Sequence, residues 1–427
     1  MTPTRRRLMQ GAAALWSALA VGGTMGTALR SRPGRASVPE RKFLFLFAGG
    51  GWDATPLDPK YGGDGISPVD GTDMDPDTFR GEIGNLSWSA GQDRPAMDAF
   101  FARWINRTAL IRGVNVHSAG HSSGRQWMMT GTSASSVADW PTTLAAHSAN
   151  DYPMPHVVFS GPAFGGSDGA ALVRGGGGTL LDLMDGSIVG ASDNPAPVVP
   201  TPSDAMADAL VYERALAYAD SKEGLGKSRA EDLLASLDRA EELEGRRFEA
   251  GLADGGRDFL DQCLMATEIM RLGLSRCAMV GIPGGWDTHG GNQNVGPQMD
   301  VLFDSLDQLM THLATTPGRD AEWLIDEVTI VATSELGRTP MFNGAMGRDH
   351  WPYTSMMALG SGIRGNTVCG ATDDRFISVP VDLTTGQVKE DGDLLGTENV
   401  GAALLKLGGL DPEIYRPGIK SLDGLIR

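Results

Sequence analysis

Cysteine and histidine are scarce in this sequence, with three cysteines and seven histidines among 427 residues. Cys263, Cys277 and Cys369 are too few and too scattered for a disulfide framework or a cysteine-based zinc site. Cys277 lies in the apolar run CAMVGI, so we expect a small buried hydrophobic residue there, whereas Cys369 could be paired or free. A metal centre in this chain would therefore depend on histidines and carboxylates.

Positive charge is also scarce. The chain has 36 Lys and Arg against 53 Asp and Glu, a formal net charge of −17. All six basic residues up to Arg35 precede the first acidic residue, Glu40, so the remaining chain has 30 basic and 53 acidic residues, a net charge of −23. A protein this acidic has no expected basic patch, and we expect no nucleic-acid binding.

Long apolar runs are absent after residue 28. Before that point, MTPTRRRLMQGAAALWSALAVGG places Arg5, Arg6 and Arg7 ahead of an apolar run rich in Ala and Gly. This pattern predicts a twin-arginine signal peptide and linker over residues 1–36, and hence a periplasmic or secreted protein. An uncleaved membrane anchor is the alternative, but the run is short and only moderately apolar. We expect no transmembrane span in the mature chain. Twin-arginine export acts on folded proteins that often carry a cofactor, which favours a bound metal.

Glycine, in contrast, is abundant, with 58 residues, about twice the ordinary share of ~7%. Short apolar runs typical of strands alternate with helical patterns, which predicts an α/β fold with a mainly parallel central sheet. We expect a three-layer sandwich, a single domain over residues 41–427, and a helical, loop-rich insertion near 162–255. The predicted strands are the apolar part of RKFLFLFAGGGWD and residues 108–116, 156–161, 277–282 and 327–333, with a helix at 299–315. The three glycines after the first strand would let the backbone turn sharply beside a ligand.

Polar side chains recur where these strands end. In open α/β sheets, ligands bind beyond the carboxyl ends of the strands, so we expect one crevice there. Carboxylates combined with imidazoles suit zinc, manganese or iron, whereas sites made only of oxygen suit calcium and magnesium. The residues in such positions, together with one from GRDHWPY, are Asp53, His117, His121, Asp287, His289, Glu335 and His350.

Each of these groups also has a simpler interpretation. In GGWDTHGGN, Asp287 and His289 could cap the next helix. Glu335 could pair with Arg338 at the surface, and Asp349 and His350 could form a hydrogen-bonded loop pair. The histidines outside any polar cluster are expected to be structural or exposed, namely His147, His156 and His312.

The order of the motifs resembles the domain-of-unknown-function 1501 family and, through it, the alkaline phosphatase and sulfatase superfamily, from about Arg41 to Asp374. RKFLFLFAGGGWD resembles the first strand with its metal-binding Asp, and GGWDTHGG resembles an Asp-and-His loop that binds the other metal. EVTIVATSELG resembles the strand and turn that supply Asp-His or Asp-Asn, and GRDHWPYTSMMALGSGIRG resembles the later His segment. The resemblance implies an alkaline phosphatase-like fold.

HSSGRQWMMTG resembles the nucleophile segment of sulfatases. Thr130 and Gly131 align it, Arg125 falls on the family's Arg, and His121 falls where the nucleophile should stand. Leu336 occupies a ligand position and removes that ligand. His121 could be a ligand or, like Ser122, a nucleophile or base.

The resemblance implies one complete metal site and one altered site. The complete site is formed by Asp287, His289 and His350, and the altered one by Asp53, Glu335 and His121. His117 and Asp349 are candidates to replace missing ligands, and Arg125 and Arg338 to bind an anionic group.

The expected function is therefore that of an exported, metal-dependent hydrolase of a phosphate or sulfate ester. The substrate would be an anionic small molecule or polymer, and the cofactor a divalent metal, whether zinc, manganese, calcium or magnesium. One alternative is a catalytically reduced family member that binds an envelope component or a partner protein through the same cleft. Phosphoryl transfer of the mutase kind is a third hypothesis, because one fold can carry many reactions.

Overall fold

The structure is a computed structural model that describes residues 39–60, 66–67, 80–175, 202–234 (except 225, 228 and 232) and 258–427. Within these ranges, no helix is both long and apolar enough to span a membrane. The predicted signal peptide lies outside the described residues. The chain divides into two units: one contains 39–149, 155–174 and 258–427, and the other contains 1–38, 150–154 and 175–257.

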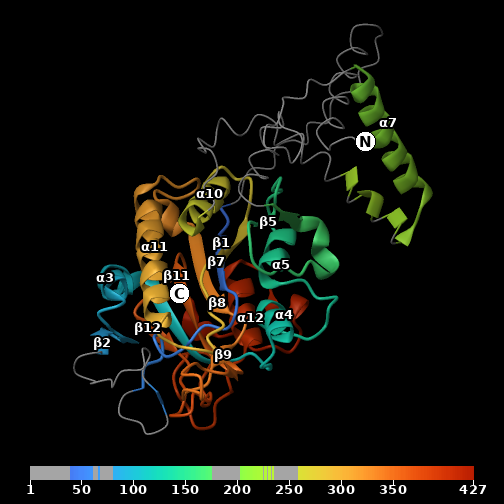
Figure 1. The fold of residues 1–427 in the computed structure, drawn as a ribbon. Coiled ribbons are helices and arrows are strands. Elements are labelled where there is room, and N and C mark those ends of the chain that lie inside the picture. The colour runs from blue at the N-terminus through green and yellow to red at the C-terminus, as the bar shows by residue number, and fades with distance from the viewer. Residues whose placement is uncertain are drawn as a thin grey trace. The chain divides into compact units, whose positions relative to one another are not determined.

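An eight-stranded sheet is the centre of the first unit (Figure 1), with the strand order β12-β4-β11-β8-β1-β7-β5-β6. Only β11 runs antiparallel to its neighbours; the other pairings in this sheet are parallel. The strands are β1 (Lys42–Ala48), β4 (Thr108–Asn115), β5 (His156–Val158), β6 (Leu172–Arg174), β7 (Cys277–Ile282), β8 (Val328–Ser334), β11 (Tyr353–Gly360) and β12 (Thr367–Cys369).

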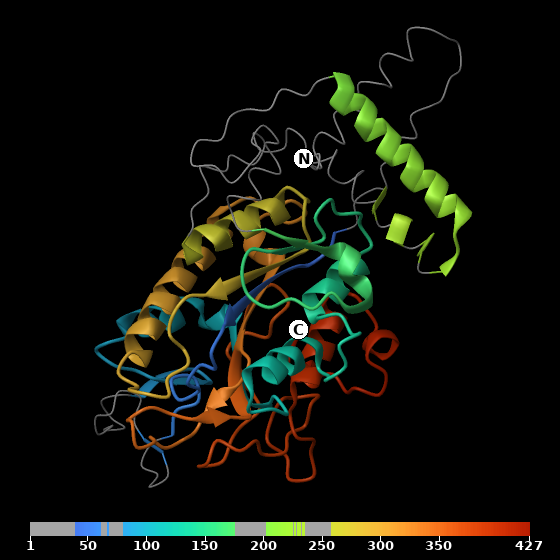
Figure 2. The ribbon, with the colours of Figure 1, turned by 45° about the vertical axis from the view of Figure 1, so that its right-hand side comes forward.

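Helices cover both faces of this sheet (Figures 1 and 2). On one face lie α3 (Pro95–Trp104), α10 (Phe259–Arg271) and α11 (Val295–Thr315). On the other face lie α4 (His121–Thr130), α5 (Trp140–Ala146) and α12 (Thr397–Leu407). The predicted α/β three-layer sandwich with a mainly parallel sheet is confirmed.

The central strands are continuous apolar runs because helices cover them on both sides. All seven residues of β1, KFLFLFA, are buried, and so are all seven of β8. Alternate residues of a strand point to the same face, and Phe43, Phe45 and Phe47 share one core cluster with Trp140 of α5 and Leu404 of α12. This packing fixes the strand ends that carry the polar residues.

Smaller elements complete the unit. They are the hairpin β2 (Arg80–Ile83) and β3 (Leu86–Ser89), the pair β9 (Gly337–Arg338) and β10 (His350–Trp351), the helix α13 (Pro412–Tyr415), and the 3-10 helices η1 (Ile105–Arg107), η2 (Gly166–Ala171), η3 (Leu324–Asp326) and η4 (Asp423–Leu425). The cysteines Cys263, Cys277 and Cys369 are all free and buried.

The second unit contains α7 (Pro202–Ser221) and a small core in which Ala215, Ala219, Ala230 and Leu234 pack with Tyr212. Residues 235–255 of the predicted helical insertion lie outside the described residues. The insertion predicted near 162–255 begins before this unit, whose main segment is 175–257. Within the range of the predicted insertion, residues 166–174 form η2 and β6 of the first unit. Strand β6 is short and carries too weak a pattern to recognise in the sequence.

Candidate metal centre

Five of the expected site residues meet at the carboxyl ends of the parallel strands. His121 opens α4 after β4, Asp287 and His289 follow β7, and Glu335 follows β8 directly. His350 lies in β10, just before β11. Because β11 is antiparallel, its start lies at the edge where its neighbours end. His350, which lies just before β11, is therefore at the same edge of the sheet as the other four residues.

Three imidazoles converge on the Asp287 carboxylate through their Nε2 atoms. The distances to its oxygens are 3.5 Å from His121, 3.3 Å from His289 and 3.6 Å from His350. The Nε2 atoms of His289 and His350 lie 2.9 Å apart. Ligand atoms of His121, Asp287 and His350 all lie within 4.8 Å of one another, so these residues form a possible metal site.

The other ring nitrogen of each histidine faces an acceptor. Nδ1 of His121 lies 3.0 Å from Glu335 Oε1, and Nδ1 of His289 lies 2.9 Å from Asp349 Oδ1. Nδ1 of His350 lies 2.7 Å from the carbonyl oxygen of Ala119. These oxygens can each accept a hydrogen bond from Nδ1–H, and a neutral ring that donates in this way has its lone pair on Nε2.

Asp287 is half exposed, and a buried arginine holds one of its oxygens. Arg338 Nη2 donates to Asp287 Oδ1 at 2.6 Å. Partial burial raises the pKa of Asp287, but the hydrogen bond and charge of Arg338 and the charges of His121 and His289 lower it more. The pKa therefore lies below its ordinary value, and Asp287 is a carboxylate at neutral pH.

Asp287 and His289 do not cap the following helix. The N-cap of α11 is Asn294, which makes no side-chain cap hydrogen bond. Asp349 and His350 do not form the expected loop pair either, because Asp349 contacts His289 and accepts from Asn343 Nδ2 at 3.0 Å. The Asn343 bond, and after it the His289 bond, lowers the pKa of Asp349.

Glu335 is wholly buried and lies behind His121. Its Oε1 accepts from the backbone N–H of Gly50 at 2.8 Å and lies 3.5 Å from Nε of Arg125. Of the residues expected in the altered site, the structure brings Glu335 and His121 into contact. The expected surface pair with Arg338 is wrong, because Glu335 is buried. Its carboxylate contacts Gly50, Arg125 and His121, and His121 links it to the Asp287 cluster.

Asp53 stands apart from the cluster in a buried ion pair. Its Oδ2 lies 2.9 Å from Arg348 Nε and accepts from Asn292 Nδ2 at 3.0 Å, and its Oδ1 accepts from the N–H of Thr55. The role expected for Asp53 as a metal ligand therefore needs correction, since a guanidinium already neutralises this carboxylate. A metal ligand and a partner in a buried ion pair can both follow a strand, so the position of Asp53 in the sequence could not distinguish these two roles.

His117 and Arg338 also have other roles than those expected. His117 Nε2 lies 3.1 Å from Glu398, whose hydrogen bond raises the pKa of His117 against the opposing effect of burial. Arg338 donates to the carbonyl oxygens of Gly50, Gly51 and Arg348 as well as to Asp287, so its guanidinium has no free edge for an anion. Its role is structural.

Ser122 and Arg125 lie beside His121 on the first turns of α4, and both are exposed. The N-cap of this helix, Gly120, provides no side-chain hydrogen bond, so the first N–H groups keep their capacity to bind an anion. The candidate nucleophile Ser122 and the candidate anion-binding residue Arg125 therefore lie next to His121.

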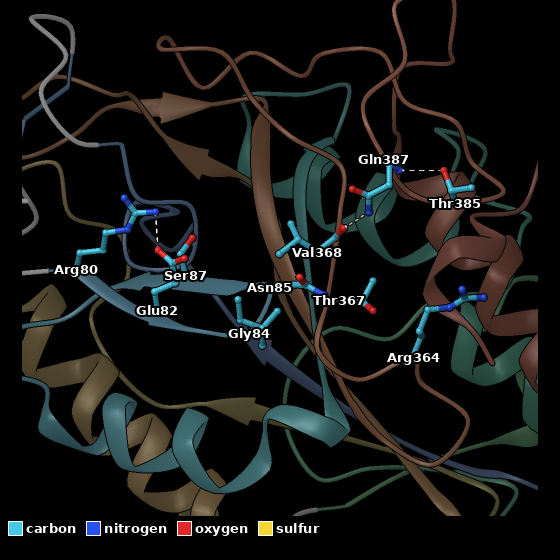
Figure 3. Close-up of a pocket in the computed structure, with 11 residues that line it drawn as sticks. Arg80, Glu82, Gly84, Asn85, Ser87, Arg364, Thr367, Val368, Thr385 and Gln387 are labelled. Carbon is cyan, nitrogen blue, oxygen red and sulfur yellow. Dashed lines mark hydrogen bonds and ion pairs between the residues drawn. The ribbon is translucent and has the colours of Figure 1, made fainter.

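A separate hollow of about 640 Å³ lies between the β2–β3 hairpin and the edge strand β12 (Figure 3). None of its lining residues belongs to the histidine cluster. Arg80 pairs with Glu82 at 2.6 Å, and Gln387 Nε2 donates to the carbonyl oxygen of Val368 at 3.0 Å. These polar groups bind one another rather than converging on a common point.

Asn343, Asn292 and Arg348 were not expected near the candidate site. Asn343 lies in the loop PMFNGAMG, where the Asn-Gly pair indicates only a turn. Arg348 directly precedes Asp349 and His350, but the sequence does not reveal that its side chain is buried against Asp53. No sequence pattern specifies the contacts of Asn292 and Arg348 with Asp53, because these residues are more than 200 positions apart.

Solved structures with some similarity to this chain include sulfatases. Ps i-CgsB, in complex with k-i-k-neocarrahexaose, matches with a TM-score of 0.38 and 9% identity over 90% of this chain and 75% of that one. A 2-O GAG sulfatase matches with a TM-score of 0.33 and 11% identity over 90% and 75%. PsFucS1 sulfatase from Pseudoalteromonas sp. matches with a TM-score of 0.32 and 12% identity over 100% and 76%.

The comparison with curated proteins found no match. One family model does match, over residues 44–413, which is most of the chain and includes every residue of the cluster. The chain belongs to the DUF1501 family, described as proteins of unknown function.

Proposed function

We propose that this protein is an exported, metal-dependent hydrolase that acts on a phosphate or sulfate ester. The observation that carries the proposal is the convergence of three imidazole Nε2 atoms on the carboxylate of Asp287. The predicted signal peptide supports export, and the exposed start of α4 supports an anionic substrate.

The donor set fits a divalent metal. The Nε2 atoms of His289 and His350 lie 2.9 Å apart. When both rings are neutral and protonated on Nδ1, their Nε2 lone pairs face each other, and a cation bound by both would relieve the repulsion. Imidazole-rich sites with one carboxylate suit zinc, whereas calcium, magnesium and manganese prefer oxygen ligands. Of the four metals expected, zinc therefore fits best, with His121, His350 and Asp287 as ligands and His289, which lies beside His350 and Asp287, as a fourth.

When bound, such a metal would polarise an ester oxygen and lower the pKa of an attacking water or hydroxyl group. The chain itself would orient the substrate. Arg125 and the first N–H groups of α4 would hold the anionic group. Both ring nitrogens of His121 are engaged, which favours a ligand role for it and leaves Ser122 as the candidate nucleophile.

Replacing His350 by Ala tests this function. The variant should lose at least tenfold in metal affinity and most of its ester hydrolysis, because one imidazole and its contact to His289 disappear. Metal content of the purified protein and turnover of aryl phosphates and aryl sulfates would be measured together. The matched control is His147→Ala, which removes an exposed histidine paired with Asp168 outside the cluster.

Wild-type protein that binds no zinc or manganese, or whose hydrolysis is unaffected by His350→Ala, would overturn the proposal. Metal binding without turnover of any ester would instead favour the second candidate function, a catalytically reduced protein that binds an envelope component or partner. Two contacts favour that candidate: buried arginines already neutralise Asp287 and Asp53.

A further inference from the structure

We propose that Glu335 and Asp349 are positioning residues that set metal affinity by fixing two of the histidines. This inference rests on the proposed function, since it concerns the same centre. The two carboxylates occupy equivalent places: each faces the Nδ1 atom of a histidine whose Nε2 atom points to Asp287. Neither carboxylate is then a ligand itself.

Glu335 acts from inside the fold. Its side chain is 0% exposed, and its Oε1 contacts both the N–H of Gly50 and Nδ1 of His121. The backbone can approach so closely only at a glycine, because Gly50 has φ +125 and a Cβ there would lie 2.8 Å from the backbone nitrogen of Asp287. The glycine turn after β1 therefore anchors the carboxylate that orients His121.

Asp349 acts from the surface, with its side chain 59% exposed. A free carboxylate at such a position would rotate, but Asn343 Nδ2 donates to the same Oδ1 that faces His289. Asn343 Nδ2 also contacts the carbonyl oxygen of His289 at 3.0 Å, and its Oδ1 accepts from the N–H of Gly347 at 3.1 Å. The loop that carries Asn343 thus holds Asp349 against the imidazole.

The third histidine needs no such side chain, because Nδ1 of His350 faces the backbone carbonyl of Ala119. Each ring is therefore fixed in the tautomer that presents Nε2. Hydrogen bonds of this kind orient metal-binding imidazoles and make them better donors, and their loss commonly reduces metal affinity about 10- to 100-fold.

The decisive variant is Asp349→Ala, because an exposed side chain can be removed with little effect on folding. Zinc affinity, measured by chelator competition, should fall about 10- to 100-fold. Asp349→Asn should recover part of the loss, since the amide oxygen can still accept from Nδ1. Glu335→Gln should weaken zinc binding in the same direction, provided that thermal unfolding shows the variant to be folded.

The matched control is Glu398→Ala, which removes the carboxylate from His117 outside the cluster and should leave zinc affinity unchanged. A second readout needs no metal: nitrogen NMR of the histidine rings should show the Nδ1–H tautomer of His289 in wild-type protein and a mixture in Asp349→Ala. Wild-type protein without zinc affinity would refute the proposed function. Tight binding that Asp349→Ala leaves unchanged, with an unchanged tautomer, would refute this inference alone.

Discussion

At the scale of single residues, the side chains around each carboxylate decide its chemistry. Asp53 and Asp287 both follow parallel strands, and both have a buried arginine beside them. Asp53 is itself buried and has Arg348 as its ionic partner, whereas Asp287 is half exposed and still faces three imidazoles. Of these two carboxylates, only Asp287 therefore remains available to bind a metal.

Replacing Arg348 by Met should strongly destabilise the first unit. The change leaves the buried carboxylate of Asp53 without its counter-ion, and breaking a buried pair from one side costs about 3–5 kcal/mol. Urea denaturation would give the change in the free energy of unfolding. Arg103→Met is the control, because its pair with Asp307 is exposed and should contribute less than about 1 kcal/mol. Equal effects of the two changes would contradict the assignment.

At the scale of elements, α5 and β5 enclose two titratable groups. Asp139 caps α5 by accepting from the N–H of Thr142 at 2.8 Å, and His156 opens β5 with Nδ1 2.9 Å from Thr142 Oγ1. Burial raises the pKa of Asp139 to about 6, against the hydrogen bonds from Thr142 and Phe164. Burial, aided by the charge of Arg174, lowers the pKa of His156 to about 3.

The two shifts act on stability in opposite directions. His156 takes up a proton more readily in the unfolded chain, so its contribution is fully present above pH 6.5 and is lost as pH falls toward 3. Asp139 takes up a proton more readily in the folded chain, so its contribution grows as pH falls from about 6 toward 3.8. In the wild-type protein the two contributions therefore partly cancel.

Replacing His156 by Gln should therefore change how stability depends on pH. Relative to wild type, the free energy of unfolding of the variant should rise as pH falls below 6.5, by on the order of 2 kcal/mol at pH 5, because the variant has no buried imidazole at position 156. Urea denaturation at pH 7.5, 6 and 5 would measure the difference. His147→Gln, at an exposed histidine, should show little change with pH. A constant difference between His156→Gln and wild type would contradict the shift.

At the scale of the whole molecule, apolar runs in the sequence predict the layers of the fold but not the direction of every strand. Residues 277–282 form β7 as expected, and 108–116 and 327–333 correspond closely to β4 and β8. The antiparallel course of β11 could not be predicted, because a buried strand has the same apolar pattern in either direction. That reversal is what brings His350 to the cluster, whereas the partners of Asp53 and Glu335 depend on tertiary packing.

The division into two units leads to a last prediction. Every residue of the histidine cluster belongs to the unit of 39–149, 155–174 and 258–427, and so do β1, α5 and α12, which share one core. Replacing residues 176–257 by a Gly/Ser linker of about 20 residues should leave this unit folded, because flexible loops add little closure entropy with length.

Thermal unfolding and zinc titration of the shortened chain, with the full chain as control, would measure the outcome. We expect a cooperative transition and a zinc affinity within about twofold of the full chain, since every ligand and every Nδ1 acceptor remains. Adding His350→Ala to the shortened chain should lower zinc affinity at least tenfold, as expected for the full chain. A shortened chain that folds but no longer binds zinc would mean that residues 176–257 contribute to the centre, and that the predicted insertion is part of the functional site.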